Sequence, residues 1–127
     1  MIQSHFHCLK IGDLNLTNFD VVFNKSFKNC IKNLKKRFPS VKKDVKKAIE
    51  ILLQNPKLGI RIPGGHDVRK LRLKNSDLKR GKSGGYRLLY FFEKDSNNCL
   101  YFLFIYSKSD KENVTKKEIE KLICEIH

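Results

Sequence analysis

The chain has 127 residues, which suits one domain with a single core and excludes a large multidomain enzyme with a separate substrate domain. Apolar residues make up 40% of the chain, enough for it to fold. The formal net charge of +14 favours a polyanionic partner, with nucleic acid as the first expectation and an anionic membrane as the second.

The positive excess is confined to two central segments. Residues 24–50 and 57–90 each hold ten basic and two acidic residues, whereas residues 1–23 and 91–127 are each slightly acidic. A fold that brings the two segments together would create one strongly basic face.

The first half of the chain predicts a strand followed by a helical hairpin. Residues 19–23 (FDVVF) are typical of a short strand. Apolar residues then recur at helical spacing over 26–38, and Pro39 ends that helix. Ser40 can N-cap a second helix, which Asn55-Pro56 ends. The very short connection makes the two helices antiparallel, with most of their lysines facing outward.

The second half predicts three antiparallel strands. A breaker-rich loop over 56–65 precedes the strand 68–74, in which leucines alternate with Lys and Arg. A loop leads to the strand 86–93, and a turn at 95–98 leads to the strand 100–108, which is apolar on both faces and should lie inside the sheet.

The C-terminal segment carries a strong helix signal. Thr115 and Glu118 fit a capping box, and Val114 and Ile119 fit the hydrophobic staple beside it. The predicted order is therefore β-α-α-β-β-β-α, an α+β fold in which a small antiparallel sheet packs against the hairpin and the C-terminal helix. Residues 1–18 are ambiguous, either an extra strand or an ordered arm.

The compartment is expected to be the cytoplasm. No signal peptide is evident, no apolar run approaches the 20 or so residues of a membrane span, and the four cysteines (Cys8, Cys30, Cys99 and Cys124) form no CxxC pair. We therefore expect reduced, buried thiols and no membrane partner.

Known cofactor and metal motifs do not fit the chain. The GKS at 81–83 lacks the first glycine of a phosphate loop, because Ser76 stands there, and a strand rather than a helix follows it. His5, His7 and Cys8 lack a fourth ligand at zinc-site spacing. We expect neither a metal nor a small-molecule cofactor.

The strongest constellation is basic and lies along the predicted meander. Neighbouring strands can gather these groups into a cleft suited to a phosphodiester, since Arg forks grip two phosphate oxygens and Lys supplies a point charge. In RNA cleavage by the 2′-OH, cations placed in advance stabilise the phosphorane. A non-catalytic RNA-binding face explains the charge equally well. The members of this constellation are Arg69, Lys70, Arg72, Lys82, Arg87, Tyr106, Lys108 and Lys111.

Arg87 has a distinctive position, after two glycines and before an apolar run. A charge on a buried strand is costly unless a ligand or a partner uses it. The alternative to a ligand is a salt bridge to Asp67, Glu93 or Asp110.

Several segments resemble one toxin superfamily. VRKLRLKNSDLKRGKSGGYRLLYFF, followed by LYFLFIYSKSDKENVT, is similar to the RelE/ParE superfamily, nearest to HigB-type toxins, and the helical hairpin and NPKLGIRIPGG loop match too. The resemblance covers residues 19–123 and is carried by several segments in order. It implies that the chain is a single RelE-like domain over 1–127, a toxin of a bacterial toxin–antitoxin pair that a cognate antitoxin neutralises.

The resemblance also implies an activity and a set of site residues. Most RelE-like and HigB-like members cut mRNA in the ribosomal A site without a metal, which makes the ribosome and mRNA the expected partners; ParE-like members inhibit DNA gyrase instead. Arg87 matches an arginine at the scissile phosphate. Where some relatives carry a catalytic Tyr, this chain has Thr115, so the general base stays open among Lys70, Lys82 and Tyr106. The expected RNA-binding residues are Arg69, Arg72, Lys74, Lys108 and Lys111.

Overall fold

A computed structural model describes residues 20–78, 85–93 and 98–126 of the protein. The element order is β1 (Asp20–Phe23), α1 (Lys25–Lys35), α2 (Val41–Gln54), β2 (Ile60–Arg61), β3 (Arg69–Leu73), β4 (Tyr86–Glu93), β5 (Cys99–Ser107) and α3 (Lys116–Ile126). Residues 1–18, the GKS segment and most of the predicted turn at 95–98 lie outside the described residues.

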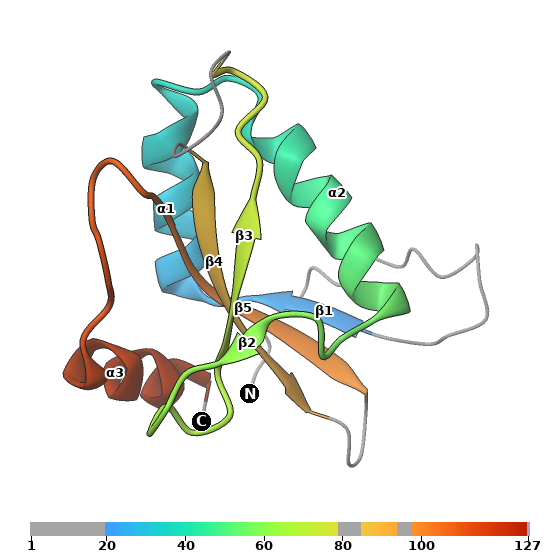
Figure 1. The fold of residues 1–127 in the computed structure, drawn as a ribbon, viewed down its shortest axis with the longest axis vertical. Coiled ribbons are helices and arrows are strands. Elements are labelled where there is room, and N and C mark those ends of the chain that lie inside the picture. The colour runs from blue at the N-terminus through green and yellow to red at the C-terminus, as the bar shows by residue number, and fades with distance from the viewer. Residues whose placement is uncertain (1–19, 79–84, 94–97, 127) are drawn as a thin grey trace.

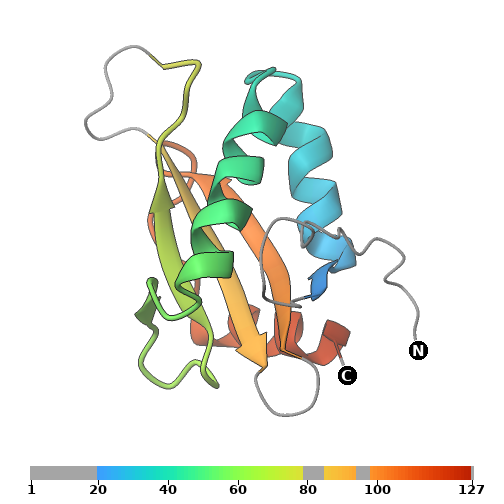
Figure 2. The same ribbon diagram turned by 90° about the vertical axis from the view of Figure 1, so that its right-hand side faces the viewer.

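One five-stranded sheet carries the fold, with its strands in the order β1-β5-β4-β3-β2. The α1–α2 hairpin covers one face, and α3 covers part of the opposite face near one end (Figures 1 and 2). This arrangement confirms the predicted α+β fold, the helical hairpin and the antiparallel β3–β4–β5 meander.

The sheet differs from the prediction at both edges. β1 runs parallel to β5, which makes the sheet mixed rather than wholly antiparallel. Its direction was not predictable from a turn, because most of the chain separates the two strands. β2 is an additional strand paired with β3, in a segment predicted as loop. Both residues of β2 are exposed, so the segment lacks the alternation of buried apolar and exposed polar residues that identifies a strand.

Helices pack on both faces of the sheet, so the interior strands need apolar residues on both faces, as β4 shows. Leu88 and Tyr90 pack under the α1–α2 hairpin, whereas Leu89 packs against α3 residues such as Ile119. β5 is apolar throughout for the same reason, and it lies between β1 and β4 as an interior strand.

A bulge in β5 changes which face its residues occupy. Leu89 pairs with Phe104 and Tyr90 pairs with Phe102, so Leu103 has no opposite residue on β4. Beyond the bulge the alternation is reversed, and Tyr106 pairs with Arg87 on the face that α3 partly covers.

The side chain at the N-cap accepts a hydrogen bond from the helix backbone in α1 and α3 but not in α2. Glu118 N–H donates to Thr115 Oγ1 at 3.1 Å and Thr115 N–H donates to Glu118 Oε1 at 2.8 Å, which confirms the capping box of α3. Ser40 does occupy the N-cap position of α2, but its side chain makes no capping bond. Its backbone N–H instead donates to Asp77 Oδ2 at 2.8 Å.

Within the described residues, no helix combines the length and the apolar character that crossing a membrane requires. Cys99 is buried and Cys30 half-buried, but Cys124 is exposed, so the prediction of a buried thiol is wrong at Cys124. Cys8 lies outside the described residues.

Candidate functional site

Three predicted site residues form a row across the three strands of the meander, near the ends of β3 and β5 and the start of β4. Arg72 on β3 pairs with Arg87 on β4, which in turn pairs with Tyr106 on β5. Directly opposed residues point to the same face with Cβ atoms about 4.5–5.5 Å apart. We call Arg72, Arg87 and Tyr106 the cationic row; Arg72 is exposed, Arg87 half-buried and Tyr106 buried.

No carboxylate within the described residues neutralises Arg87. Its one hydrogen bond there is weak, from Nη1 to the Tyr86 carbonyl at 3.3 Å. The three acids considered as salt-bridge partners are engaged elsewhere: Asp67 with Arg61 at 2.5 Å, Glu93 with the Tyr101 hydroxyl at 3.1 Å, and Asp110 with Arg37. The guanidinium is thus held on the sheet with its charge unpaired among these residues.

Tyr106 presents a second unsatisfied group in the row. Its side chain is buried, and its hydroxyl has no hydrogen-bond partner among the described residues. Burial raises the pKa of Tyr106, while the nearby charges of Arg87 and Lys111 act in the opposite direction. The phenol is therefore neutral near pH 7, which suits a hydrogen-bond donor better than a proton acceptor. A buried donor without a partner is costly to keep.

Lys111 is held beside the row by α3. Its Nζ donates to Glu118 Oε2 at 2.9 Å, and the same carboxylate caps the helix through Thr115. Thr115 therefore has a structural role here, as its N-cap pattern predicted.

Glu118 makes this part of the structure sensitive to acid. The backbone N–H of Thr115 first, and Lys111 second, lower the pKa of the Glu118 carboxyl below its ordinary value. A carboxyl with a lowered folded-state pKa contributes stability that is present above its unfolded pKa and is lost as the pH falls through the folded value. We expect the melting temperature of Glu118→Gln to fall less on acidification below about pH 5 than that of the wild type. Parallel acid-melting curves for the two proteins would contradict this.

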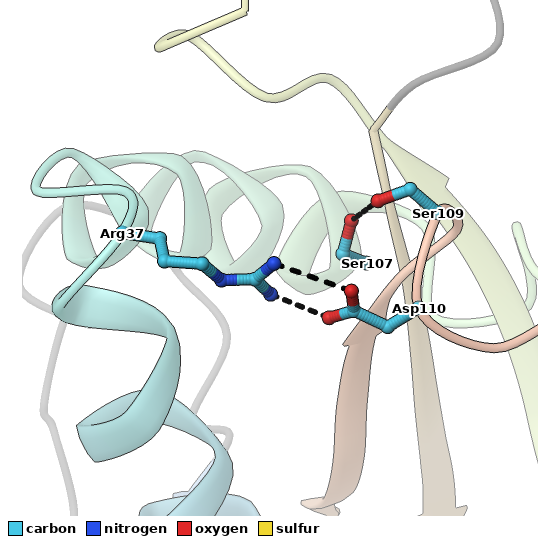
Figure 3. Close-up of polar contacts among 4 residues, drawn as sticks. All are labelled: Arg37, Ser107, Ser109 and Asp110. Atoms are coloured by element: carbon cyan, nitrogen blue, oxygen red, sulfur yellow. Dashed lines mark hydrogen bonds and ion pairs between the residues drawn. The ribbon is translucent and has the colours of Figure 1, made fainter.

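The tip of the helical hairpin holds the segment that follows β5. Arg37, just beyond α1, forms an ion pair with Asp110, and both side chains are about half exposed. Figure 3 shows this pair next to a hydrogen bond of 3.0 Å between the Ser107 and Ser109 hydroxyls. The pair links the end of the first helix of the hairpin to the turn that carries Lys108 and Lys111.

The same tip holds the segment that follows β3. Asp44 on α2 is 5% exposed and accepts hydrogen bonds from the Ser76 hydroxyl and from the Ser76 backbone N–H, the latter at 3.0 Å. Asp44 was not among the predicted site residues, although its position carries a signal: helical spacing places this acid on the apolar stripe with Val41, Val45 and Ala48. Arg37 and Asp110 have no such local signal.

The other predicted residues divide between the two faces and the loops. Lys70 shares the face of the cationic row, because it pairs with Leu89. Arg69 points to the opposite face, where Nη1 donates to the carbonyls of Gly59 at 2.7 Å and Lys57 at 3.1 Å. Arg69 therefore does not join the predicted cleft, because neighbouring strand residues face opposite sides.

Two further predicted residues flank the sheet and one lies outside the structure. Lys74 directly follows β3 and is exposed, and Lys108 directly follows β5, with its N–H donating to the Gly85 carbonyl at 3.0 Å. Lys82 lies outside the described residues. Across the parts that the structure describes, no three His, Cys, Asp or Glu side chains cluster as a metal site would require.

A comparison with protein families identifies the class of protein. Residues 21–124 match the family model described as the RelE toxin of the RelE/RelB toxin–antitoxin system. The matched range spans every strand and helix of the fold except the first residue of β1 and the last two of α3. The chain therefore belongs to the RelE toxin family, whose members are the toxins of toxin–antitoxin pairs.

Proposed function

We propose that this RelE-family toxin is a metal-independent endoribonuclease that cuts mRNA in the ribosomal A site and so inhibits translation. The observation that carries the proposal is the cationic row, in which, among the described residues, the Arg87 guanidinium has no carboxylate partner and the Tyr106 hydroxyl has no hydrogen-bond partner. Two arginines and a neutral phenol on one face form a set of donors suited to a phosphodiester.

The reaction would use the 2′-OH of the RNA as nucleophile. A base removes the proton of the 2′-OH while the 2′ oxygen bonds to phosphorus. The bond from phosphorus to the 5′ oxygen then breaks. Arg87 and Arg72 stabilise the charge that grows on the non-bridging oxygens. Tyr106 donates its proton toward the leaving 5′ oxygen, as its neutral phenol allows. Lys70, on the same face, and Lys82 remain the candidates for the base.

RNA binding by such a surface should depend steeply on salt, because phosphate contacts release counterions. We expect the affinity for a fluorescein-labelled single-stranded RNA to fall on a log–log plot with a slope of roughly 0.7 per phosphate contact. Arg72→Ala should lower that slope by the contribution of about one phosphate contact. Arg61→Ala, at the β2 edge, should leave the slope unchanged. Fluorescence anisotropy across a salt series measures this, and an affinity independent of salt would contradict a phosphate-binding surface.

The proposed reaction is testable with purified components. The toxin is added to a translation mixture programmed with a defined mRNA, and primer extension locates new 5′ ends with and without ribosomes. The proposal predicts ends at A-site codons only when ribosomes are present, and persistence of cleavage in EDTA once the ribosomes are stabilised by cross-linking. Intact mRNA, together with inhibition of DNA supercoiling by gyrase in a parallel assay, would favour the ParE-like activity instead.

A further inference from the structure

Glu118, in the first turn of α3, connects that helix to a cation beside the cationic row. Its two carboxylate oxygens have different partners. Oε1 accepts the backbone N–H of Thr115 at 2.8 Å, and Oε2 accepts Lys111 Nζ at 2.9 Å. One oxygen therefore completes the helix cap, and the other holds an ammonium group in place.

The backbone of Lys111 is anchored next to the row as well. Its N–H donates to the carbonyl of Ser107 at 3.3 Å, and Ser107 directly follows Tyr106 in β5. Electrostatics places the side chains of the pair near the same phenol. Burial is the largest influence on the pKa of Tyr106 and raises it, and Arg87 lowers it. The charge of Lys111 also lowers this pKa, and the charge of Glu118 raises it.

The contact with Glu118 gives Lys111 an order that a lysine lacks by itself, because its flexible four-carbon stem lets the ammonium move widely. Glu118 is in turn held by reciprocal hydrogen bonds with Thr115. An ammonium has three donors, so Lys111 can keep this contact and still donate to a phosphate oxygen. The side chains of Lys111 and Glu118 are 32% and 43% exposed, and pairs as exposed as this contribute little to stability.

We propose that Glu118 is a positioning residue for RNA cleavage, which holds the Lys111 ammonium beside Tyr106 so that it donates to an oxygen of the reacting phosphate. The inference rests on the ribonuclease activity proposed above. Glu118 then has two opposite effects. Its negative charge repels the phosphates of RNA, whereas its contact with Lys111 places a cation for the reaction. Removal of the charge should therefore affect RNA binding and the cleavage rate differently.

Glu118→Gln tests this difference without removing the helix cap. Glutamine also fits a capping box, and its Oε1 can still accept the Thr115 N–H, but its Nε2 group is a donor and cannot accept from Lys111. We expect the single-turnover cleavage rate on ribosomes programmed with a defined mRNA to fall roughly tenfold. The affinity for fluorescein-labelled single-stranded RNA should not fall, because the change removes a negative charge.

Two control variants separate the contact with Lys111 from the charge and from the cap. Glu120→Gln makes the same change of charge on α3, at an exposed carboxylate 3.9 Å from His66. It should leave the cleavage rate close to that of the wild type. Thr115→Ala removes the hydroxyl that accepts the Glu118 N–H and keeps the Lys111–Glu118 pair. It should lower the melting temperature while the folded protein still cleaves at nearly the wild-type rate.

A double-mutant cycle shows whether Glu118 acts through Lys111. In a Lys111→Ala background, Glu118→Gln should slow cleavage no further, because the group that it positions is already absent. Losses that multiply in the double variant would mean that Glu118 acts by another route. Both results are compared with melting curves of the same proteins.

The remaining outcomes overturn the inference in ways that can be told apart. If the wild type cleaves and Glu118→Gln cleaves equally fast, Glu118 has no positioning role, and the proposed ribonuclease activity stands. A loss of RNA affinity that accounts for the slower cleavage would mean that Glu118 serves binding instead. If the wild type itself leaves the mRNA intact, the proposed activity is wrong and the inference fails with it.

Discussion

Replacing Arg87 with alanine is expected to slow RNA cleavage by roughly 10²–10³-fold, the loss typical when one preorganised donor to a developing oxyanion is removed. The melting temperature should change little, because Arg87 has no carboxylate partner within the described residues and its single hydrogen bond there is long. The cleavage rate and the melting temperature are measured on the same purified protein.

Arg61→Ala is the matched control for Arg87→Ala. It removes the same side chain from the β2 edge, where the guanidinium is exposed and paired with Asp67. Exposed pairs contribute about 0–1 kcal/mol, so Arg61→Ala should alter neither quantity greatly. Full cleavage by folded Arg87→Ala would remove this residue from the site. A large loss of melting temperature in Arg87→Ala would mean that the side chain has a structural role instead.

Gly85→Ala is expected to cause the largest loss of stability among the changes considered, and to impair cleavage as well. Gly85 has a φ of +96°, in a region that costs other residues about 1–3 kcal/mol. A Cβ there would lie 2.6 Å from the carbonyl oxygen of Leu73, a backbone atom that moves only with β3. We expect the melting temperature to fall by roughly 3–5 °C for each kcal/mol lost. Displacement of β3 from β4 would also separate Arg72 from Arg87.

Gly64→Ala separates the cost of the positive φ from the cost of the collision with β3. Gly64 also has a positive φ, +68°, but an added Cβ there would meet only the Lys116 side chain, at 3.7 Å. It should therefore show the conformational cost without the collision, and it should leave cleavage intact. If the two alanine variants melt at the same temperature, the close approach of Gly85 to β3 is not a determinant of stability.

The helices and the meander could be predicted because their signals are local. Apolar spacing indicates α1 and α2, and the Thr115–Glu118 capping box locates the start of α3. The alternation of leucine with Lys70 and Arg72 along β3 was also confirmed by the strand register. Each of these signals depends on residues within a few positions of one another.

The remaining features depend on contacts that no local pattern encodes. Sequence alternation alone would place Tyr106 with Phe102 beneath the hairpin, and the bulge at Leu103 turns it to the face of Arg87. Arg69 is close to the site residues in sequence, yet it occupies the other face because it alternates with Lys70. The Arg37–Asp110 pair joins positions 73 residues apart and follows only from the packing of the hairpin tip against β5.

The most direct test of the proposed nuclease is the position of new RNA ends in cells. Brief induction of the wild-type toxin, followed by sequencing of RNA 5′ ends, should reveal cuts inside open reading frames that are aligned with codons, and Arg87→Ala expressed at the same level should produce none. Growth arrest with intact mRNA, or cuts without relation to reading frame, would contradict ribosome-dependent cleavage at the cationic row.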